Sequence, residues 1–433
     1  MSSPYKTVSL QTLGCKLNYT ETSMISKEFL DNGYAIVDKN QSADIYVINT
    51  CSVTDNADRK ARKAIRSCLR KSPEAKIAVI GCYAQLKPDE ISKIPGVSIV
   101  LGAEKKFDIV NVIESSKSSG SVIVNKSDIK DVTQFNPSYS SGERTRSFLK
   151  IQDGCDYSCS FCTIPLARGY SRSASIANTL KQVEKISKTD IKEIVLTGVN
   201  VGDFGRANNE SFYDLIEELD ALKGIERFRI SSIEPNLLTD QIIRFISQSS
   251  KFLPHFHIPL QSGDDNVLKS MKRRYNTKLY SQKLNLIKSI MPYASIGIDV
   301  IVGYPTETES SFNQTFSFLE NLEISYLHVF SYSIRSNTKS ASIKHQVPAD
   351  IISKRSRKLR ELSYKKTQAF YLKNIGSINE VLIENYEDGF VFGYTKNYIS
   401  VMIRGNANLV NHIFPVRLLE INDDKILGEI VAW

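Results

Sequence analysis

The chain has 433 residues, of which 41% are hydrophobic and 24% are charged. These values are typical of a globular protein of two to four domains at roughly 150 residues per domain. No apolar run approaches the roughly 20 residues that span a bilayer, so we expect no membrane role. The formal net charge of +9 favours polyanionic partners, although charge alone leaves nucleic-acid binding open.

The N-terminal residues carry no targeting signal that we can identify. Met1–Thr7 has neither a basic start followed by an apolar stretch nor a small-residue cleavage site, so we expect a cytoplasmic protein. In a reducing compartment, cysteines are more often metal ligands or catalysts than disulfide partners. The seven cysteines are therefore candidates for chemistry.

Short apolar strands alternate with amphipathic helices over the first hundred residues. The predicted buried strands are residues 8–13, 45–49, 77–80 and 97–101. This alternation predicts a parallel sheet with helices on its faces, in an N-terminal α/β domain of residues 1–115. Residues 116–146 are rich in Ser, Lys, Asp and Asn and are predicted to be a linker.

A second series of strands follows the linker. Its predicted members are residues 148–151, 193–197, 228–231, 256–260, 296–302 and 327–332. A helical stretch follows each of the first five, which predicts an open (β/α)6 barrel over residues 147–350, smaller than a closed barrel of eight units. Residues 351–375 are predicted to form a basic linker helix. Five short strands within residues 376–433 predict a small β-barrel, a scaffold that often holds RNA.

Cys155, Cys159 and Cys162 form a CxxxCxxC run directly after the first strand of the predicted barrel. Three thiolates so close together can hold one metal centre, and soft thiolates favour iron-sulfur or zinc. A structural zinc site needs four ligands, and no fourth cysteine or histidine lies nearby in the sequence. Three cysteines instead leave one iron of a 4Fe–4S cube open to a substrate. The run also lies at the end of the barrel where active sites are found.

Three further cysteines each follow a predicted parallel strand of the first domain. They are Cys15, Cys51 and Cys82, and the carboxyl ends of parallel strands meet at one edge of a sheet, where such folds bind ligands. We therefore expect these three to converge in space. Cys68 differs, because it shares a helical face with Ala61 and Ile65 and is predicted to be a structural core residue.

Two sets of three cysteines on one chain narrow the possible families. Together with the stretch Ile164–Arg172 and the terminal β module, they resemble the radical S-adenosylmethionine (SAM) methylthiotransferases over essentially the whole chain. The segments that carry the likeness to the MtaB branch are Gly14–Asn18, Asn49–Thr54, Gly81–Gln85 and Ala167–Ser173. That branch acts on N6-threonylcarbamoyladenosine next to the tRNA anticodon. The sibling branch that acts on isopentenyladenosine usually has Gln where this chain has Lys16.

The resemblance implies a radical SAM barrel, a terminal barrel of the TRAM type, and two 4Fe–4S clusters with SAM as cofactors. The catalytic cluster would be held by the CxxxCxxC cysteines, and the auxiliary cluster, which delivers sulfur, by the first three cysteines. An aromatic C–H at C2 of adenosine is too weakly acidic for a side-chain base. A radical derived from SAM would remove this hydrogen, and a second SAM would methylate the sulfur.

The resemblance also implies contacts to SAM. Phe161 and the loop of Thr197, Gly198 and Asn200 are expected to touch it, with help from Gln261 and Asp299. Asp299 is also a candidate by its position alone, because the alternation along its strand turns its side chain into the barrel.

Candidate contacts to tRNA come from three parts of the chain. The full set is Arg59, Arg62, Lys63, Arg66, Arg335, Tyr394, Lys396 and Tyr398. The first four share a predicted helix after Cys51, where phosphate contacts would be salt-sensitive. Arg335 is a candidate anion contact, but Ser-Asn-Thr follows it where the family usually has Pro-Gly-Thr. The two tyrosines are candidates for stacking on bases, and the alternative is that they are core residues of an ordinary barrel.

Two alternatives stay open. The nearer is a sibling methylthiotransferase that acts on isopentenyladenosine or on an aspartate of a ribosomal protein. The remote one is a non-catalytic iron-sulfur electron carrier or RNA-binding regulator, against which the open iron of the CxxxCxxC motif argues. The expected partners are the tRNA anticodon stem-loop, an electron donor protein and a sulfur source, and we expect a monomer.

Overall fold

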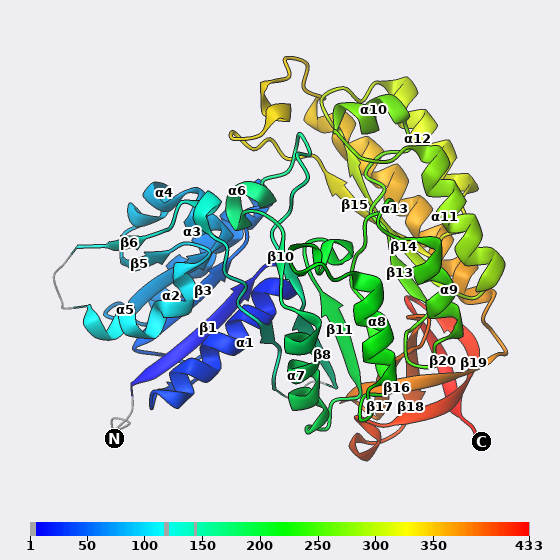
Figure 1. Cartoon of the computed structure of the whole chain (residues 1–433), viewed down its shortest axis with the longest axis horizontal. Coiled ribbons are helices and arrows are strands. Elements are labelled where there is room, and N and C mark those ends of the chain that lie inside the picture. The colour runs from blue at the N-terminus through cyan, green and yellow to red at the C-terminus, as the bar shows by residue number, and fades with distance from the viewer. Residues whose placement is uncertain (1–5, 117–120, 143–144, 433) are drawn as a thin grey trace. The chain divides into compact units, whose positions relative to one another are not determined.

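The computed structural model describes residues 6–116, 121–142 and 145–432 (Figure 1). The remaining linker residues, 117–120 and 143–144, lie outside the described part, as do residues 1–5 and residue 433. The chain folds into two compact units. The first comprises Met1–Ser141, Phe148–Ser173 and Ser333–Ala341, and the second Gly142–Ser147, Ala174–Tyr332 and Ser342–Trp433.

A six-stranded sheet forms the centre of the first unit. Its strands are β1 (Thr7–Leu13), β2 (Ala35–Ile36), β3 (Ile45–Thr50), β4 (Lys76–Gly81), β5 (Val97–Leu101) and β6 (Ile123–Asn125). Their order is β2-β1-β3-β4-β5-β6, and every pairing is parallel. The predicted parallel α/β domain is confirmed, and β6 adds an edge strand inside the stretch predicted to be a linker.

Helices cover both faces of this sheet. They are α1 (Lys16–Asp31), α2 (Asp55–Lys71), α3 (Cys82–Leu86), α4 (Pro88–Ser92) and α5 (Ile109–Ser115). Tyr46 and Ile48 of β3 pack in one core with α2, α3 and α4, whereas Ile45 and Val47 pack in a second core with α1 and α5. Successive strand residues point to opposite faces, so a strand covered on both sides is a continuous apolar run.

The capping residues fix where α2 begins. The side-chain oxygen of Thr54 accepts a hydrogen bond from the amide of Ala57, which satisfies one of the free N–H groups of the first turn. Asp55 and Asp58 lie in that turn and Arg70 and Lys71 in the last one, which complements the helix dipole. The cap places the helix directly after the Cys51 turn.

The first unit also contains the segment that carries the CxxxCxxC run. The end of β8 (Arg146–Lys150) pairs antiparallel with β7 (Ser138–Tyr139), and β9 (Gln152–Asp153) pairs antiparallel with β10 (Arg172–Ser173). The short helix α6 (Ile164–Arg168) lies on the loop from β9 to β10. This loop therefore begins and ends on paired strands.

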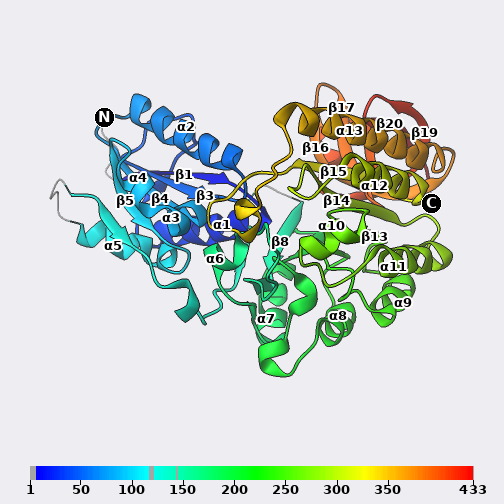
Figure 2. The ribbon, with the colours of Figure 1, turned by 90° about the horizontal axis from the view of Figure 1, so that it is seen from above.

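The second unit holds a partial barrel of parallel strands with helices outside it (Figure 2). Its strands are β11 (Glu193–Thr197), β12 (Arg227–Ile230), β13 (His255–His257), β14 (Ser295–Val302) and β15 (Tyr326–Ser331), and β8 is the neighbour of β11 in the sheet order β12-β11-β8-β7. The pairs β11–β12, β13–β14 and β14–β15 are parallel. Six strands in open order confirm the expected (β/α)6 architecture.

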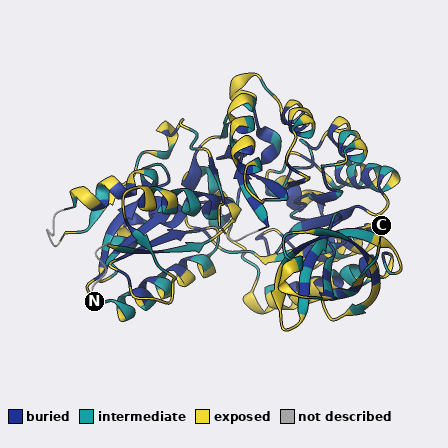
Figure 3. Ribbon diagram, turned by 90° about the horizontal axis from the view of Figure 1, so that it is seen from below, coloured by how far each residue is buried: buried dark blue, intermediate teal, exposed yellow. Residues whose placement is uncertain are grey.

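The helices of this unit follow the strands in turn. They are α7 (Ile176–Ser187), α8 (Phe212–Ala221), α9 (Asp240–Gln248), α10 (Asp265–Ser270), α11 (Thr277–Ile290), α12 (Glu309–Asn321) and α13 (Ala349–Leu372). In Figure 3 the strands are mostly buried, whereas the helices expose their outer faces. The basic helix predicted near residue 351 is α13, which buries Leu359 and Leu362.

A closed five-stranded barrel ends the chain. Its strands are β16 (Ile378–Glu387), β17 (Phe390–Thr395), β18 (Ser400–Arg404), β19 (Ile413–Asn422) and β20 (Lys425–Ile430), in the order β16-β17-β18-β20-β19. Val381, Val401 and Val416 are among the residues of its core. The small β-barrel expected from the sequence is confirmed.

One strand is shorter than its apolar pattern predicts. β13 ends at His257 rather than at Leu260, because Pro259 has no N–H to donate and Gln261 has a positive φ of 70°. No helix in the described residues is long and apolar enough to cross a membrane.

Candidate iron-sulfur and nucleotide sites

Three cysteines of the first unit follow strand ends that lie side by side. Leu13 of β1 pairs with Thr50 of β3, and Thr50 pairs with Gly81 of β4. Cys15 lies two residues beyond its strand, whereas Cys51 and Cys82 follow theirs directly. The strand register therefore brings the three thiols to one edge of the sheet, as the sequence predicts.

Close backbone approaches hold these strand ends together. A Cβ on Gly14 would lie 3.0 Å from the Cβ of Cys51 and 3.0 Å from the side chain of Asn18. Gly81 has a φ of 94°, and a Cβ there would lie 2.5 Å from Asn49 Oδ1. Only glycine fits such a conformation without strain.

Asn18 joins the strand ends through its side chain. Its amide nitrogen donates to Asn49 Oδ1 at 2.9 Å and to the Thr50 carbonyl at 3.1 Å. Its amide oxygen accepts a hydrogen bond from the Cys15 thiol at 3.1 Å. Asn18 is fully buried, so this contact sets the position of Cys15 relative to its neighbours.

The electrostatics show that the three thiols influence one another. Burial raises the pKa of the Cys51 thiol to about 12, and charges on Cys82 and Cys15 raise it as well, while Arg168 lowers it. Burial also raises the pKa of Cys82, and Arg168 and Lys106 lower it. Three neighbouring thiolates need a cation to compensate their charge, and soft thiolates suit an iron-sulfur cluster. The donor set therefore fits a cluster with three cysteine ligands.

Cys68 is a core residue, as its helical spacing predicts. It is fully buried and packs among Ala61, Ile65 and Ile77. Its sulfur accepts a hydrogen bond from the side-chain amide of Gln11 at 3.4 Å. It belongs to the α2 face of the sheet and not to the cysteine-bearing edge.

The CxxxCxxC run forms a tight loop after β9. The Cys155 amide donates to the Gly169 carbonyl at 3.0 Å, and the Cys162 amide to the Cys159 carbonyl at 3.2 Å. Backbone amides of Tyr157 and Ile164 donate to the sulfurs of Cys155 and Cys162, each at 3.4 Å. Such N–H donors stabilise negative charge on thiolates that ligate a cluster. The loop therefore fits a second cluster with three cysteine ligands.

A glycine before the run is required by the backbone. Gly154 has a φ of 69°, and a Cβ at this position would lie 1.9 Å from the Tyr170 carbonyl oxygen. The Asp153 carboxylate accepts a hydrogen bond from the Gly154 backbone amide at 2.8 Å. The two ends of the loop are thus pressed together where Cys155 begins.

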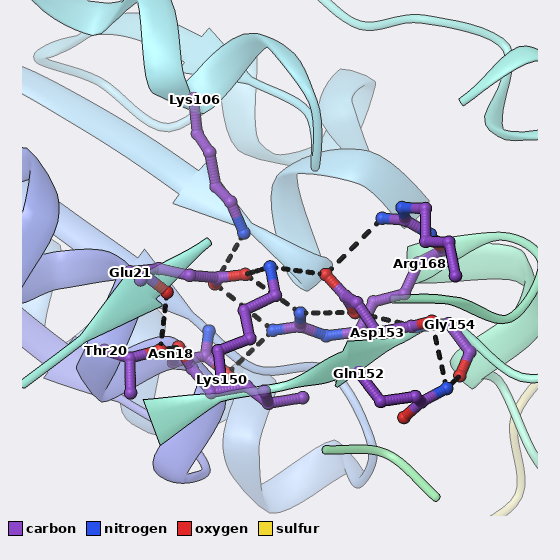
Figure 4. A network of polar contacts seen from close by, with 12 residues as sticks. Asn18, Thr20, Glu21, Lys106, Lys150, Gln152, Asp153, Gly154 and Arg168 are labelled. Carbon is purple, nitrogen blue, oxygen red and sulfur yellow. Dashed lines mark hydrogen bonds and ion pairs between the residues drawn. The ribbon is translucent and has the colours of Figure 1, made fainter. Parts of the chain in front are cut away.

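A group of buried charges forms a network of polar contacts in the first unit (Figure 4). Its members are Glu21, Lys106, Lys150, Asp153 and Arg168, each at most 3% exposed. Arg168 Nη1 lies 3.0 Å from Glu21 Oε1 and 3.0 Å from Asp153 Oδ1. Lys150 Nζ bridges the same two carboxylates, at 3.1 and 2.7 Å, and Lys106 Nζ lies 2.5 Å from Glu21 Oε2.

The sequence reasoning missed this network, although it singled out Ala167–Ser173 as a motif. The available signal was a set of charges within apolar surroundings, such as Glu21 inside α1 and Lys150 at the end of β8. A charged residue on a face that packs against a core needs a partner. The sequence alone does not show which residues pair.

The residues expected to contact SAM lie in both units. Phe161 is half-buried in the cysteine loop of the first unit. In the second unit, Thr197 ends β11, and the Asn200 side-chain amide donates to Asp203 Oδ2 at 2.8 Å. The Gln261 amide donates to the Asp299 carbonyl at 2.9 Å, so these two predicted contacts are neighbours in the barrel.

Asp299 forms the centre of a polar group inside the partial barrel. His257 Nε2 lies 2.8 Å from Asp299 Oδ1, and the His257 ring stacks on His328 with centroids 5.3 Å apart. Ile298 and Val300 on either side are fully buried, which confirms the alternation expected for β14. His255 is buried, and its Nε2 lies 2.8 Å from the Tyr326 hydroxyl, a position inside the barrel.

The basic residues of α2 fall into two groups. Arg59, Lys63 and Arg66 are exposed, although Arg59 pairs with Asp55 at 3.1 Å. Arg62 instead bonds the Tyr83 hydroxyl at 3.0 Å and Glu90 at 2.7 Å. The exposed residues offer charge to a polyanion, whereas Arg62 is already engaged in the fold.

Arg335 is buried within the first unit. Its Nη2 donates to Ser52 Oγ at 2.7 Å and lies 2.9 Å from Asp58 Oδ2, and the residue is 6% exposed. Nearby, the Ser333 hydroxyl accepts a hydrogen bond from the Asp55 backbone amide at 3.1 Å. Arg335 thus binds an anionic side chain of this chain, next to the turn that carries Cys51.

The tyrosines of the terminal barrel stack on other residues of the second unit. The rings of Tyr394 and Tyr398 lie 4.7 Å apart and nearly parallel. Arg229 lies 4.4 Å from the Tyr398 ring centroid and Arg146 lies 5.2 Å from that of Tyr394. Lys396 pairs with Glu380 at 2.8 Å. These contacts accord with the alternative that the tyrosines are packing residues.

Two family models match the chain. The model described as "Uncharacterized protein family UPF0004" matches residues 7–102, which include Cys15, Cys51 and Cys82. The model of the Radical SAM superfamily matches residues 149–319, which include the CxxxCxxC run. Each match therefore contains one of the two cysteine sets.

Curated proteins are similar over nearly the full length. The threonylcarbamoyladenosine tRNA methylthiotransferase MtaB of Bacillus subtilis is 38% identical over 96% of this chain and 94% of its own. The MtaB of Aquifex aeolicus is also 38% identical, over 90% and 97%. A tRNA-2-methylthio-N(6)-dimethylallyladenosine synthase of Clostridium botulinum is 30% identical over 97% and 96%.

A solved structure shares the fold. The radical SAM methyltransferase TsrM from Kitasatospora setae, with cobalamin and a 4Fe–4S cluster bound, superposes with a TM-score of 0.56. The likeness covers 78% of this chain and 77% of that one at 12% identity. At that identity it supports the architecture only.

Proposed function

The chain belongs to the radical SAM methylthiotransferase family, and on that premise we propose the reaction it performs. It converts N6-threonylcarbamoyladenosine next to the tRNA anticodon to the 2-methylthio derivative. The relatives of higher identity are named for this substrate, whereas the dimethylallyladenosine synthases are less similar, at 30%. The cofactors are two 4Fe–4S clusters and SAM.

The observation that carries the proposal is the presence of two separate thiol sets in one chain. The register of β1, β3 and β4 assembles Cys15, Cys51 and Cys82, and a glycine-initiated loop assembles the CxxxCxxC cysteines. An electron carrier needs neither an open iron nor a second set of three ligands. Two such sets suit a reaction that needs both a radical and a sulfur source.

Each thiol set has its own task in the proposed reaction. Cys155, Cys159 and Cys162 hold the cluster at which SAM is bound, and the other three cysteines hold the auxiliary cluster. When bound, the clusters and SAM supply the radical and sulfur chemistry that acid–base groups cannot supply at an aromatic C–H bond. The chain itself fixes the ligands through N–H···S bonds, the Asn18 contact and the strand register.

The contacts to SAM and tRNA are part of the proposal. We propose that Phe161, the loop of Thr197, Gly198 and Asn200, and the neighbours Gln261 and Asp299 bind SAM. The exposed cations Arg59, Lys63 and Arg66 suit phosphate contacts, because exposed charges bind a backbone without reading its sequence. The geometry favours a structural role for Arg62 and Arg335, which are paired with Glu90 and Asp58.

The division of labour along the chain is proposed on the same grounds. Residues 1–115 carry the auxiliary cluster, residues 147–350 the radical SAM barrel, and residues 376–433 a TRAM-like barrel. Residues 116–146 and 351–375 connect them. The compact units cut across these boundaries at β8, because the CxxxCxxC loop packs with the first unit. The proposed partners are the anticodon stem-loop, an electron donor protein and a sulfur source, with the protein acting as a monomer in the cytoplasm.

The experiment that tests the function is nucleoside analysis of tRNA. The gene is deleted, and digested tRNA is analysed by mass spectrometry for the 2-methylthio forms of both adenosine derivatives. We expect loss of the threonylcarbamoyl form alone, restored by the wild-type gene and not by a Cys82→Ala variant. Loss of the dimethylallyl form would assign the sibling activity. Unchanged tRNA, together with a ribosomal protein that lacks its methylthio group, would assign the activity on a ribosomal protein aspartate.

A further inference from the structure

The buried charge network of the first unit links the two cysteine sets. Asn18 lies three residues after Cys15, and Asp153 lies two residues before Cys155. Arg168 contacts both, with Nη2 at 3.3 Å from Asn18 Oδ1 and Nη1 at 3.0 Å from Asp153 Oδ1. Asn18 Oδ1 in turn accepts a hydrogen bond from the Cys15 thiol at 3.1 Å. One side chain therefore separates the Arg168 guanidinium from a ligand of the auxiliary cluster.

The network carries more positive than negative charge. Its cations are Lys106, Lys150 and Arg168, and its anions are Glu21 and Asp153. Burying charge costs several kcal/mol per ion, which pairing offsets only if the charges match. A surplus buried cation is therefore costly in itself. Burial lowers the pKa of the Arg168 guanidinium, but nearby negative charges raise it well above its usual value. These charges belong to Glu21, Asp153, Cys82 and Cys15.

The surplus positive charge of the network is balanced by negative charge when the cysteines bind a cluster. Three thiolates bring negative charge to the edge of the sheet at which Arg168 lies. A charge interaction in a buried site is several times stronger than in water, because the effective dielectric constant is lower. Arg168 reaches this edge through Asn18, whose Oδ1 lies 3.3 Å from Arg168 Nη2 and accepts a hydrogen bond from the Cys15 thiol at 3.1 Å.

We propose that Arg168 is a positioning residue that places a fixed positive charge beside the auxiliary cluster and raises its reduction potential. The inference rests on the proposed function, because it requires a cluster on Cys15, Cys51 and Cys82. Reduction adds one electron from an external donor to that cluster and breaks no bond. A cation nearby stabilises the reduced state, and an anion destabilises it. Arg168 and Glu21 must therefore shift the potential in opposite directions.

The test uses the full chain with the catalytic cluster removed. In a Cys155→Ala, Cys159→Ala, Cys162→Ala background only the auxiliary cluster remains, and its potential is measured by a dithionite titration followed by electron paramagnetic resonance. Arg168→Met is expected to lower the potential and Glu21→Gln to raise it. Each shift should reach a change of about tenfold in the ratio of reduced to oxidised cluster, or about 59 mV for one electron.

Two further variants separate charge from folding. Arg172→Met removes a cation whose side chain is 12% exposed and which lies 3.4 Å from Asp153. Because water screens this charge more than that of Arg168, the variant should shift the ratio by less than about threefold. Arg168→Lys keeps the charge and should stay within about threefold of the parent. If Arg168→Met does not fold, Arg168→Lys and Glu21→Gln still decide the question.

The outcomes distinguish the inference from the function beneath it. Shifts of the same sign, or an unchanged potential in Glu21→Gln, would show that the network only stabilises the fold and would overturn the inference. A parent triple variant without iron would instead mean that Cys15, Cys51 and Cys82 bind no cluster. In that case the proposed function fails first.

Discussion

Thr50 and Gly81 are paired neighbours at the carboxyl ends of two parallel strands. Because Cys51 and Cys82 follow them directly, residues 31 positions apart in sequence (82 minus 51) become adjacent at one edge of the sheet. The positive φ of Gly81 and its close approach to Asn49 leave no room for a side chain. The auxiliary site is thus a product of strand register and not of a local motif.

Gly154→Ala should damage the catalytic loop. The new Cβ would meet the Tyr170 carbonyl at 1.9 Å in a backbone conformation that favours glycine, so we expect a loss of more than about 1 kcal/mol in the free energy of unfolding. Iron bound by the CxxxCxxC cysteines should fall as well. Chemical denaturation and iron analysis after anaerobic reconstitution measure both effects.

Gly33→Ala is the matched control for this substitution. Gly33 has a φ of 79° but nothing within 4 Å of its Cβ position, so it shares the backbone strain without the collision. It should lose about 1 kcal/mol and keep its iron. Equal effects of the two variants would mean that the close packing at Gly154 is unimportant.

The sequence predicted the larger features of this molecule. Buried strands such as Ile45–Thr50 begin with an apolar run, and the cysteines follow the carboxyl ends of these strands in the sequence. What it did not predict depends on pairing over long distances. The contact of Arg168 with Glu21 joins residues 147 positions apart, and Arg335 meets Asp58 across 277 positions. Charge and spacing alone do not identify a partner at such separations. Arg335 was therefore predicted to be a candidate RNA contact, although it pairs with Asp58.

Arg335→Met should destabilise the protein. Its partner Asp58 is fully buried and would keep only Lys87 as a cation, with Nζ at 3.2 Å. Loss of a buried ion pair costs about 3–5 kcal/mol when a charge is left without any partner, so we expect Arg335→Met to lose part of that amount. The control Arg357→Met removes an exposed arginine and should change the free energy of unfolding by less than about 0.5 kcal/mol. Undiminished stability of Arg335→Met, combined with weaker tRNA binding, would assign the residue to the RNA instead.

The exposed cations of α2 should contribute to tRNA affinity through salt-sensitive contacts. The association constant K for tRNA decreases as the salt concentration rises. In a Lys63→Ala, Arg66→Ala double variant, the plot of log K against log salt concentration should become less steep, by about 0.7–0.9 for each phosphate that the protein no longer neutralises. Lys181→Ala, Lys185→Ala removes two exposed cations of α7 as a control. Filter binding over a range of salt concentrations gives both slopes, and identical slopes would place the RNA elsewhere.

Glu193 should make stability depend on acid pH. Burial raises its pKa, but the facing guanidinium of Arg229, at 2.8 Å, and the charges of Arg146 and Arg227 together outweigh burial, so the net pKa lies below 4.5. A depressed carboxyl pKa adds stability that is present above the unfolded value and is lost as the pH falls through the folded one. Glu193→Gln should therefore flatten the decline in unfolding free energy below about pH 4.5.

The same substitution should also lower stability at neutral pH by about 3–5 kcal/mol, because Arg229 is left buried without its partner. Glu218→Gln removes an exposed carboxylate and serves as the control. Urea denaturation at a series of pH values measures both effects. An acid limb as steep in Glu193→Gln as in the wild type would show that this pair does not govern the dependence.

The two cysteine sets should form two independent cluster sites on one chain. The most direct measurement is iron and sulfide analysis, after anaerobic reconstitution, of the wild type, of Cys155→Ala, Cys159→Ala, Cys162→Ala, and of Cys15→Ala, Cys51→Ala, Cys82→Ala, with Cys68→Ala as control. We expect about eight irons for the wild type and for Cys68→Ala, and about four for each triple variant, as two four-iron clusters require. If the variant without the CxxxCxxC cysteines loses all iron, the convergent cysteines form no site, and the assignment as a methylthiotransferase is contradicted.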